Sequence, residues 1–157
     1  MKNQILFNCL IILFANTYSF CQNELDNNGE RIGSWVGYHE NGLVKYKGQF
    51  IGGKESGLFK YYDLSGNLVI ELDYVEPGNK SNAILYYSSG SIKSKGQYVA
   101  QSKEGIWTYY NQSGKKIAKE NYLNNNLHGE SNYFFENGIL SEKYNYVNNQ
   151  KEGPAEI

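Results

Sequence analysis

Hydrophobic and polar residues alternate along most of this chain, and glycine-containing turns interrupt the alternation at regular intervals. In one such segment, 105–128, the run from Ile106 to Tyr110 is β-branched and aromatic, which is typical of a strand. Residues 111–114 end in Gly114 and favour a turn, and 116–123 return as a second strand. The segment is therefore predicted to be a β-hairpin followed by a short connection. No segment after residue 21 shows a sustained helical period, so the mature chain is predicted to contain no helix.

The hairpin pattern recurs every 24 residues, without insertion or deletion, from Gly33 to Gly153. The glycines that end the turns are Gly42, Gly66, Gly90, Gly114 and Gly138. Aromatic residues precede these glycines by four residues and follow them by eight, at Tyr38, Tyr62, Tyr86, Tyr110, Phe134 and at Phe50, Tyr74, Tyr98, Tyr122, Tyr146. A fixed period of this length indicates a repeat protein. The predicted repeats are 33–56, 57–80, 81–104, 105–128 and 129–152, between a lead-in at 22–32 and a tail at 153–157.

Stacking such hairpins gives an all-β fold, an elongated antiparallel sheet of five hairpin repeats in which each repeat contacts its neighbours. Glycines at 33, 57, 105, 129 and 153 are predicted to mark the turns between hairpins. Repeat three departs from the pattern, because Ser81 replaces this glycine and Ala83 replaces an aromatic residue. It is therefore predicted to be the weak point of the array.

The columns of equivalent positions predict which side chains face solvent. In the second strands, positions 47, 71, 95, 119 and 143 are Lys or Glu, and those two residues further on are Gln, Asp or Asn, so that side is predicted to be wet. The aromatic column that begins at Phe50 lies on the alternate side and is predicted to pack, as is the column that begins at Tyr38. The remaining aromatic residues of the first strands form a candidate binding stripe, with Trp107 and Tyr109 as its anchors. The stripe comprises Trp35, Phe59, Tyr61, Trp107, Tyr109 and Tyr133. The competing interpretation is that these residues are core.

The first 21 residues have the features of a secretory signal peptide, with Lys2 followed by an apolar run from Ile5 to Phe14. Cleavage after Cys21 leaves Gln22 as the mature N-terminus, and lipidation of Cys21 is the alternative. The only other cysteine, Cys9, lies in the same segment, so the mature chain has no disulfide. The protein is predicted to be exported, either to the periplasm or out of the cell, without an integral membrane span after cleavage.

Charge and motif content narrow the possible chemistry. The formal net charge is −1, so there is no basic footprint for nucleic acid and no polybasic membrane patch. The two histidines, His39 and His128, fall in different columns, which does not favour a metal site. No nucleophile elbow, phosphate loop or paired-carboxylate spacing is present. We therefore predict no catalytic residues, no metal and no cofactor, and a protein that is not an enzyme.

Two segments of the chain, Gly57-Leu58-Phe59-Lys60-Tyr61-Tyr62 and Gly105-Ile106-Trp107-Thr108-Tyr109-Tyr110, resemble the variant form of the MORN repeat. The resemblance covers the mature chain, although repeats three and five depart from it most. It implies a β-hairpin sheet without catalysis and roles in protein or membrane-lipid contact. Some relatives are labelled antitoxins of toxin–antitoxin pairs.

The function predicted from the sequence is that of an exported, non-enzymatic scaffold that mediates protein–protein or envelope contact. One alternative is a glycan or cell-envelope binding module, in which sugar rings stack on the aromatic stripe. A second alternative is an antitoxin-like inhibitor of a cognate toxin in the same compartment. The partner is accordingly an unknown protein or an envelope glycan.

Overall fold

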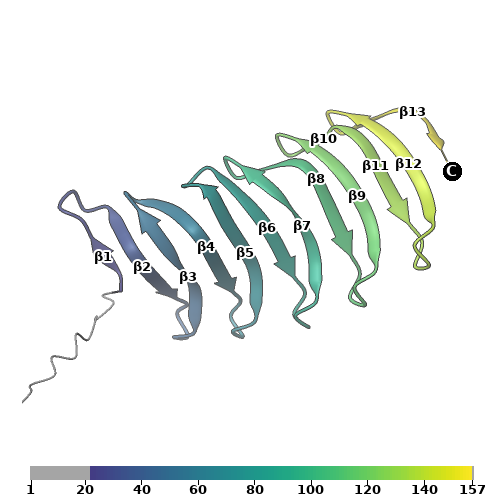
Figure 1. Ribbon diagram of the computed structural model, residues 1–157. Helices are drawn as coiled ribbons and strands as arrows, with labels where there is room; N and C mark the ends of the chain where they lie inside the picture. Colours follow the sequence, from purple (N-terminus) through teal and green to yellow (C-terminus); the bar gives the residue numbers. More distant parts are fainter. Residues whose placement is uncertain (1–21, 157) are drawn as a thin grey trace, which may run out of the picture.

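The computed structural model describes residues 22–156, which form one open antiparallel sheet of thirteen strands (Figure 1). The strands follow chain order across the sheet, except that the short β10 pairs only with β9 and β11 also pairs with β9. The predicted signal peptide lies outside the described residues. The strands are β1 (Glu24–Leu25), β2 (Arg31–Tyr38), β3 (Val44–Ile51), β4 (Lys54–Tyr62), β5 (Leu68–Glu76), β6 (Lys80–Tyr86), β7 (Ile92–Val99), β8 (Ser102–Tyr110), β9 (Lys116–Leu123), β10 (Asn126–Leu127), β11 (Gly129–Phe134), β12 (Leu140–Val147) and β13 (Gln150–Glu156).

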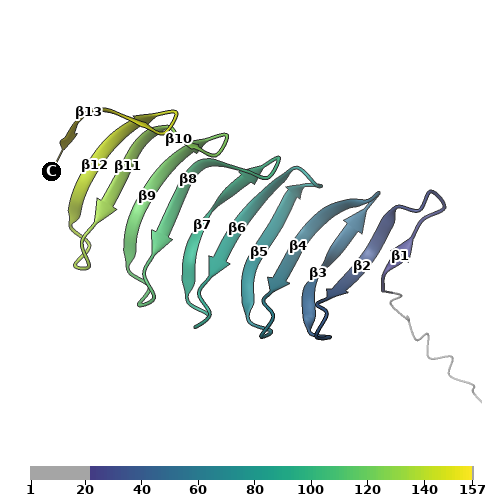
Figure 2. The same ribbon diagram turned by 180° about the vertical axis from the view of Figure 1, so that it is seen from behind.

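The sheet is a single twisted layer. Figures 1 and 2 show it from both sides, and within residues 22–156 no helix or second sheet covers either face. The predicted fold class, an all-β sheet of hairpins without a helix, is confirmed for these residues. The lead-in and the tail extend the sheet with β1 and β13, because the hydrogen-bonded ladder continues beyond the outermost hairpins.

The turn inside each repeat is built around its glycine. In the first hairpin the Gly42 amide donates to the His39 carbonyl at 2.9 Å, and the His39 amide donates to the Leu43 carbonyl at 2.8 Å. Gly42 has a φ of 82°, in the left-handed region that glycine adopts without a Cβ clash. The strand register shifts beside the turn, between Gly37 and Tyr38, and the corresponding shift recurs in every repeat.

The prediction that a second set of glycines marks the turns between hairpins is wrong. Gly57 and Gly105 lie inside strands at bulges, each with a φ of 63°. The connections at Gly52-Gly53, Ala100-Gln101, Asn124-Asn125 and Asn148-Asn149 instead have two consecutive residues with positive φ. In repeat three Ser81 pairs with Tyr74 at the end of a regular stretch of ladder, and the register shift lies on the preceding strand, between Tyr74 and Glu76.

Alternation of side chains gives the sheet two different faces. One, here called the tyrosine face, carries Phe50, Phe59, Trp107 and Tyr146, all of them buried. Rings pack edge to face on it, with centroids 5.2 Å apart for Phe50 and Phe59 and 4.9 Å apart for Tyr98 and Trp107. The other, here called the lysine face, carries the polar columns of the second strands. The core of this one-layer protein therefore consists of rings that lie across the strands of the tyrosine face.

Small and large residues complement each other across neighbouring strands of the tyrosine face. A Cβ atom at Gly48 would lie 2.5 Å from the Phe59 ring, and one at Gly96 would lie 2.4 Å from the Trp107 ring. In repeat three the equivalent cross-strand pair is Leu72 and Ala83, in which the large residue has changed strand. Glycine is therefore required wherever the next strand supplies a ring, because the ring occupies the space above the glycine backbone.

Candidate binding surfaces

The six residues of the predicted stripe all lie on the tyrosine face. Register places Tyr61, Tyr109 and Tyr133 in one row and Trp35, Phe59 and Trp107 in the next. The column that begins at Phe50 shares this face with them, as the Trp35–Phe50 and Phe50–Phe59 ring contacts show. The stripe and that column therefore form one surface and not two opposite ones. Whether the stripe binds a partner stays a prediction.

Two stripe residues have a packing role, because Phe59 is 1% exposed and Trp107 is 0% exposed. The Trp107 indole also donates from Nε1 to the Gln97 carbonyl at 3.2 Å. Trp35, Tyr61, Tyr109 and Tyr133 are half-buried, so part of each ring is accessible. In this structure Trp107 cannot anchor a partner directly, which corrects its predicted role.

The prediction that the column starting at Tyr38 packs in the core is also wrong. Tyr38 itself is 59% exposed. Other members of this column contact groups of the lysine face: Lys47 lies over the Tyr62 ring at 5.5 Å, and the Tyr86 hydroxyl donates to Glu71 at 2.7 Å. A bulge lies beside each hairpin turn, and in repeat two it falls between Tyr61 and Tyr62. Tyr62 therefore lies next to a bulge, on the face opposite to Phe59.

A chain of polar groups crosses the tyrosine face from the end of repeat three to repeat five. Lys103 donates to the Tyr109 hydroxyl at 2.7 Å, and the hydroxyls of Tyr109 and Tyr122 lie 3.1 Å apart. Glu120 accepts from Tyr122 at 2.7 Å and from Tyr133 at 3.1 Å. Burial lowers the pKa of Lys103, while the Glu120 carboxylate acts in the opposite direction. The stripe tyrosines here are held in fixed orientations by their hydroxyl groups.

Burial also governs the acidity of these tyrosines. It raises the pKa of Tyr109 well above its usual range, and the hydrogen bond with Tyr122 adds to the shift. Burial raises the pKa of Tyr122 to about 12, and its hydrogen bond to Glu120 acts in the same direction. These phenols therefore stay protonated at neutral pH and act as neutral hydrogen-bonding groups.

A hollow of about 240 Å³ opens on the tyrosine face at repeat three. Ile70 and Leu72 line it on one side, Tyr74 and Tyr98 stand around it, and Ser81 and Gln101 supply its polar atoms. It lies where Ala83 stands in place of the ring that repeats two and four provide with Phe59 and Trp107. The sequence signal for this hollow was the pair of departures at Ser81 and Ala83, which predicted a weak point and not a site.

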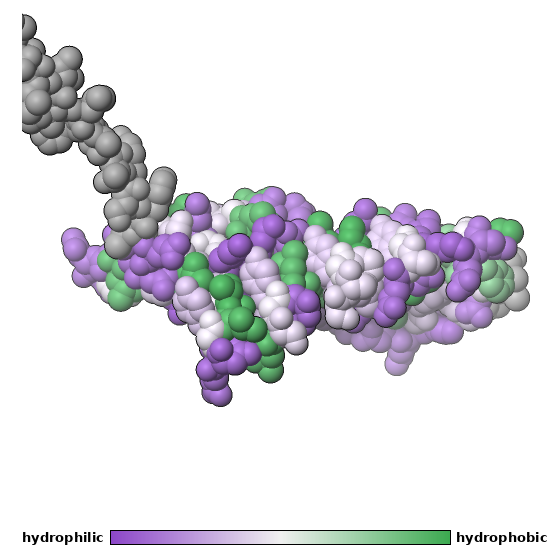
Figure 3. Space-filling view, turned by 90° about the horizontal axis from the view of Figure 1, so that it is seen from below, coloured by the Kyte–Doolittle hydropathy of each residue, from purple (hydrophilic) through white to green (hydrophobic). Residues whose placement is uncertain are grey.

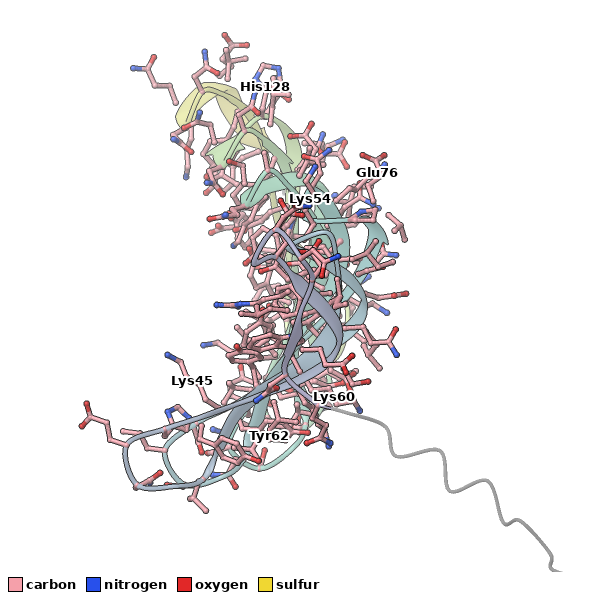
Figure 4. All side chains as sticks on the ribbon, turned by 90° about the vertical axis from the view of Figure 1, so that its left-hand side faces the viewer. Lys45, Lys54, Lys60, Tyr62, Glu76 and His128 are labelled. Carbon is pink, nitrogen blue, oxygen red and sulfur yellow. The ribbon has the colours of Figure 1, made fainter. Side chains whose placement is uncertain are left out.

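The lysine face has rows of a different character. Its central row crosses the sheet through Lys47, Lys60, Glu71, Ile84, Lys95, Thr108, Lys119, Asn132 and Lys143, each paired with the next. Lys60 forms an ion pair with Glu71 at 2.7 Å, and the hydrogen bond from Lys60 lowers the pKa of Glu71. In a view along the sheet, Lys60 and Tyr62 lie toward one end of the strands, and Lys54, Glu76 and His128 lie toward the other (Figure 4).

The structure brings no metal ligands together within residues 22–156, where no group of three or more His, Cys, Asp or Glu side chains could hold an ion. His39 donates from Nε2 to the Tyr62 carbonyl at 2.9 Å. His128 lies at a connection between hairpins and has a buried Nδ1 without a hydrogen-bond partner. In the same part of the chain, no helix is long and apolar enough to cross a membrane.

These observations define the class of the protein, an open β-sheet repeat protein built from hairpins. The model of the MORN repeat variant family matches residues 55–76, 82–100, 103–124 and 127–148, more than half of the chain. The protein therefore belongs to the MORN repeat variant family, as predicted from its sequence. The matched segments correspond to repeats two to five, and the first hairpin (β2 and β3) adds a repeat of the same geometry.

Two solved structures illustrate more distant similarity. One is a mutant of S. aureus TarM in complex with Fondaparinux, α-GlcNAc-glycerol and UDP, with 12% identity and a TM-score of 0.45 over 60% of this chain and 19% of that chain. The other, also of TarM, has 13% identity and a TM-score of 0.45 over 62% and 19%. The chain spans about a fifth of the length of these proteins. No curated protein sequence matches it.

Proposed function

We propose that this protein is an exported, non-enzymatic scaffold that holds a partner protein against its tyrosine face. The observation that carries the proposal is the ring-sized hollow at repeat three, in a face that no other layer of residues 22–156 covers. A hollow of about 240 Å³ has room for one ring, since an apolar cavity of about 150 Å³ accommodates benzene. Aromatic residues also dominate the energetically important centres of protein interfaces.

The surroundings of the hollow suit a protein side chain. Leu72 and Ile70 offer apolar contact, while Tyr74 and Tyr98 can meet an inserted ring edge to face, as Tyr98 already meets Trp107. Burial raises the pKa of both Tyr74 and Tyr98, so both remain neutral. Half-buried Tyr61 and Tyr109 on either side extend the contact surface. In this proposal the half-buried residues of the six-residue stripe enlarge the surface around the hollow. Phe59 and Trp107 are buried and contribute packing.

Export is part of the proposal and rests on the sequence of the first 21 residues. Mass spectrometry of the protein purified from its native cell should find a chain that begins at Gln22 without lipid. A cytoplasmic chain that retains Ile5 to Phe14 would refute export, and a lipid on Cys21 would replace the proposed cleavage by lipidation.

The binding proposal is tested by filling the hollow. Leu72→Trp places a larger side chain in it, whereas Ile84→Trp adds the same side chain to the lysine face of the adjacent strand. Each variant of the mature protein serves as bait for envelope fractions, and mass spectrometry identifies what is retained. We expect the wild type and Ile84→Trp to retain the same protein, and Leu72→Trp to lose it while keeping its melting temperature. Retention by all three baits would contradict the role of the hollow.

A further inference from the structure

One lysine of the tyrosine face, Lys103, is enclosed by aromatic rings. Its Nζ atom lies 4.7 Å from the ring centroids of Trp107 and Tyr122, and 5.1 Å from that of Tyr109. It also donates to the Tyr109 hydroxyl at 2.7 Å. An ammonium group is attracted to the face of an aromatic ring within about 6 Å of the ring centroid. These three rings therefore form a cage that holds an ammonium group of the protein itself.

The same three ring positions recur two repeats earlier, as Phe59, Tyr61 and Tyr74. The ring centroids of Phe59 and Tyr61 are 6.1 Å apart, and the Phe59 and Tyr74 rings meet edge to face at 5.6 Å. The pairing of β4 with β5 has the same register as the pairing of β8 with β9. In this second cage, however, Glu55 stands at the position of Lys103. The second cage, here called the Glu55 cage, thus has a carboxylate where the first has an ammonium group.

Glu55 differs from the other half-buried carboxylates of residues 22–156, because its side chain accepts no hydrogen bond within these residues. The five others each accept at least one, and they are Asp26, Asp63, Glu71, Glu104 and Glu120. Neither of the two ion pairs in the same part of the chain includes Glu55. A half-buried charge has lost part of its hydration and is stabilised by a cation or a hydrogen-bond donor beside it. The protein itself does not provide that group for Glu55.

The charge of Glu55 acts on the tyrosines of its cage. Burial raises the pKa of Tyr74, and the Glu55 carboxylate adds to this shift. Burial also raises the pKa of Tyr61 above its usual range, and Tyr74 and Glu55 contribute in the same direction. A negative charge opposes the loss of a phenol proton only when it lies nearby, so the carboxylate and the two phenols share one environment.

The Glu55 cage is accessible from solvent. Glu55, Tyr61 and Tyr74 are half-buried, so each exposes part of its side chain, whereas Phe59 is buried beneath them. In the space-filling view the molecule is long and thin (Figure 3), and no second layer within residues 22–156 covers the tyrosine face. Tyr74 also lines the hollow at repeat three. The cage and the hollow are therefore neighbouring parts of one surface.

We propose that Glu55, Tyr61 and Tyr74 bind a lysine side chain of the partner protein. Its ammonium group pairs with the carboxylate and lies against the two rings, as the ammonium group of Lys103 lies against the rings of its own cage. This inference rests on the proposed function for the partner, which places an aromatic residue in the hollow and a lysine in the adjoining cage. A lysine is favoured because the matching cage already holds one, and because its charge complements that of Glu55.

The cage can be tested without the partner by nuclear magnetic resonance spectroscopy of the isotope-labelled mature protein. The probes are the methylamides of N-acetyl-lysine and of N-acetyl-norleucine, which has the same carbon chain without the ammonium group. We expect the lysine probe, at millimolar concentrations, to shift the resonances of Tyr61 and Tyr74, and the norleucine probe to leave them unchanged. Equal shifts with both probes, or no shift with either, would overturn the proposal.

Three variants locate the site. Glu55→Gln removes the charge and should weaken binding of the lysine probe about five-fold, the upper end of the range for an exposed ion pair. Glu55→Lys supplies an internal ammonium group, as Lys103 does, and should abolish the shifts. Glu40→Lys makes the same change of charge at an exposed turn and is the control, which should bind the probe like the wild type. Unchanged binding by Glu55→Gln would refute the proposal even if Glu55→Lys failed to fold.

Capture of the partner from envelope fractions separates this inference from the proposed function. We expect the Glu55→Lys bait to lose the protein that the wild type and Glu40→Lys retain. Retention by Glu55→Lys, together with loss by Leu72→Trp, would refute the lysine contact and leave the hollow as the binding site. Retention by Leu72→Trp would instead count against the hollow, and the titration with the lysine probe would then decide the cage by itself.

Discussion

Replacing Gly96 should be among the most damaging small substitutions in the protein. A Cβ atom at this position would lie 2.4 Å from Cδ2 and Cε2 of Trp107, and Trp107 is completely buried. The ring cannot move outward without losing its edge-to-face contact with Tyr98 and its hydrogen bond to Gln97. We expect Gly96→Ala to lower the free energy of unfolding by about 1–3 kcal/mol, the usual cost of overpacking.

The same reasoning predicts a rescue. Trp107→Ala alone should cost about 3–5 kcal/mol, because it leaves a cavity above Gly96. Gly96→Leu alone should be at least as harmful as Gly96→Ala, since a larger side chain meets the same ring. Together the two changes reproduce the Leu72–Ala83 pair that the protein already uses in repeat three. The double variant should therefore be more stable than the sum of the single changes indicates, by about 1–3 kcal/mol of coupling.

Urea unfolding followed by far-ultraviolet circular dichroism measures the wild type and the four variants, since the signal of the β-sheet backbone persists without Trp107. Lys95→Ala, one residue away on the lysine face, is the control and should change stability by about 0.5 kcal/mol or less. Additive effects of Gly96→Leu and Trp107→Ala would refute the size complementarity between neighbouring strands. A Gly96→Ala variant as stable as the control would refute the position of the Trp107 ring.

Three further perturbations test other parts of the structure. Tyr98→Ala should cost about 3 kcal/mol in the same urea experiment, because it removes the ring that packs on Trp107; a loss no larger than that of Lys95→Ala would mean that the two faces are reversed. Gly105→Ala should cost about 1–2 kcal/mol although its Cβ meets nothing within 4 Å, because its φ of 63° is strained for alanine; an unchanged midpoint would argue against the bulge. Burial raises the pKa of Tyr86 and of Tyr122 to about 12 in the folded state, so the unfolded chain loses these protons first and stability should fall from about pH 10 to about pH 12. The absorbance of ionised tyrosine should follow that titration. If these tyrosines titrate at their ordinary pKa while the protein stays folded, the prediction is wrong.

Much of this fold could be predicted from the sequence because the repeat is strict. Gly42 and its equivalents at 24-residue intervals require turns with positive φ, and the strands between them have few alternatives. The polar columns that begin at Lys47 and Gln49 and the aromatic column that begins at Phe50 were assigned correctly, since Lys, Gln and Asn alternate there with aromatic residues. A clear polar and apolar alternation determines a face as soon as the residues are known to form a strand.

The faces of the first strands could not be predicted in the same way. Phe59, Tyr61 and Tyr62 are all aromatic, so neither side of the strand is marked as polar. Alternation places Tyr62 and Phe59 on opposite faces, but which of them lies on the lysine face depends on the pairing with the neighbouring strands, which a hydrophobicity pattern does not encode. Knowledge of the register was also needed to see that Gly96 and Trp107 are neighbours, because 10 residues separate them in the chain.

Repeat three illustrates how a departure from a repeat can create a site as well as weaken a fold. Its bulge lies on β5, between Tyr74 and Glu76, and not on the first strand of the repeat, and Leu72 compensates in part for the small Ala83. What remains is a hollow between Tyr74 and Tyr98, in the repeat that lies between those of Phe59 and Trp107. A uniform array of identical repeats would present the same surface at every position and could not fix where along its length a partner binds. The irregular repeat supplies that position on the tyrosine face.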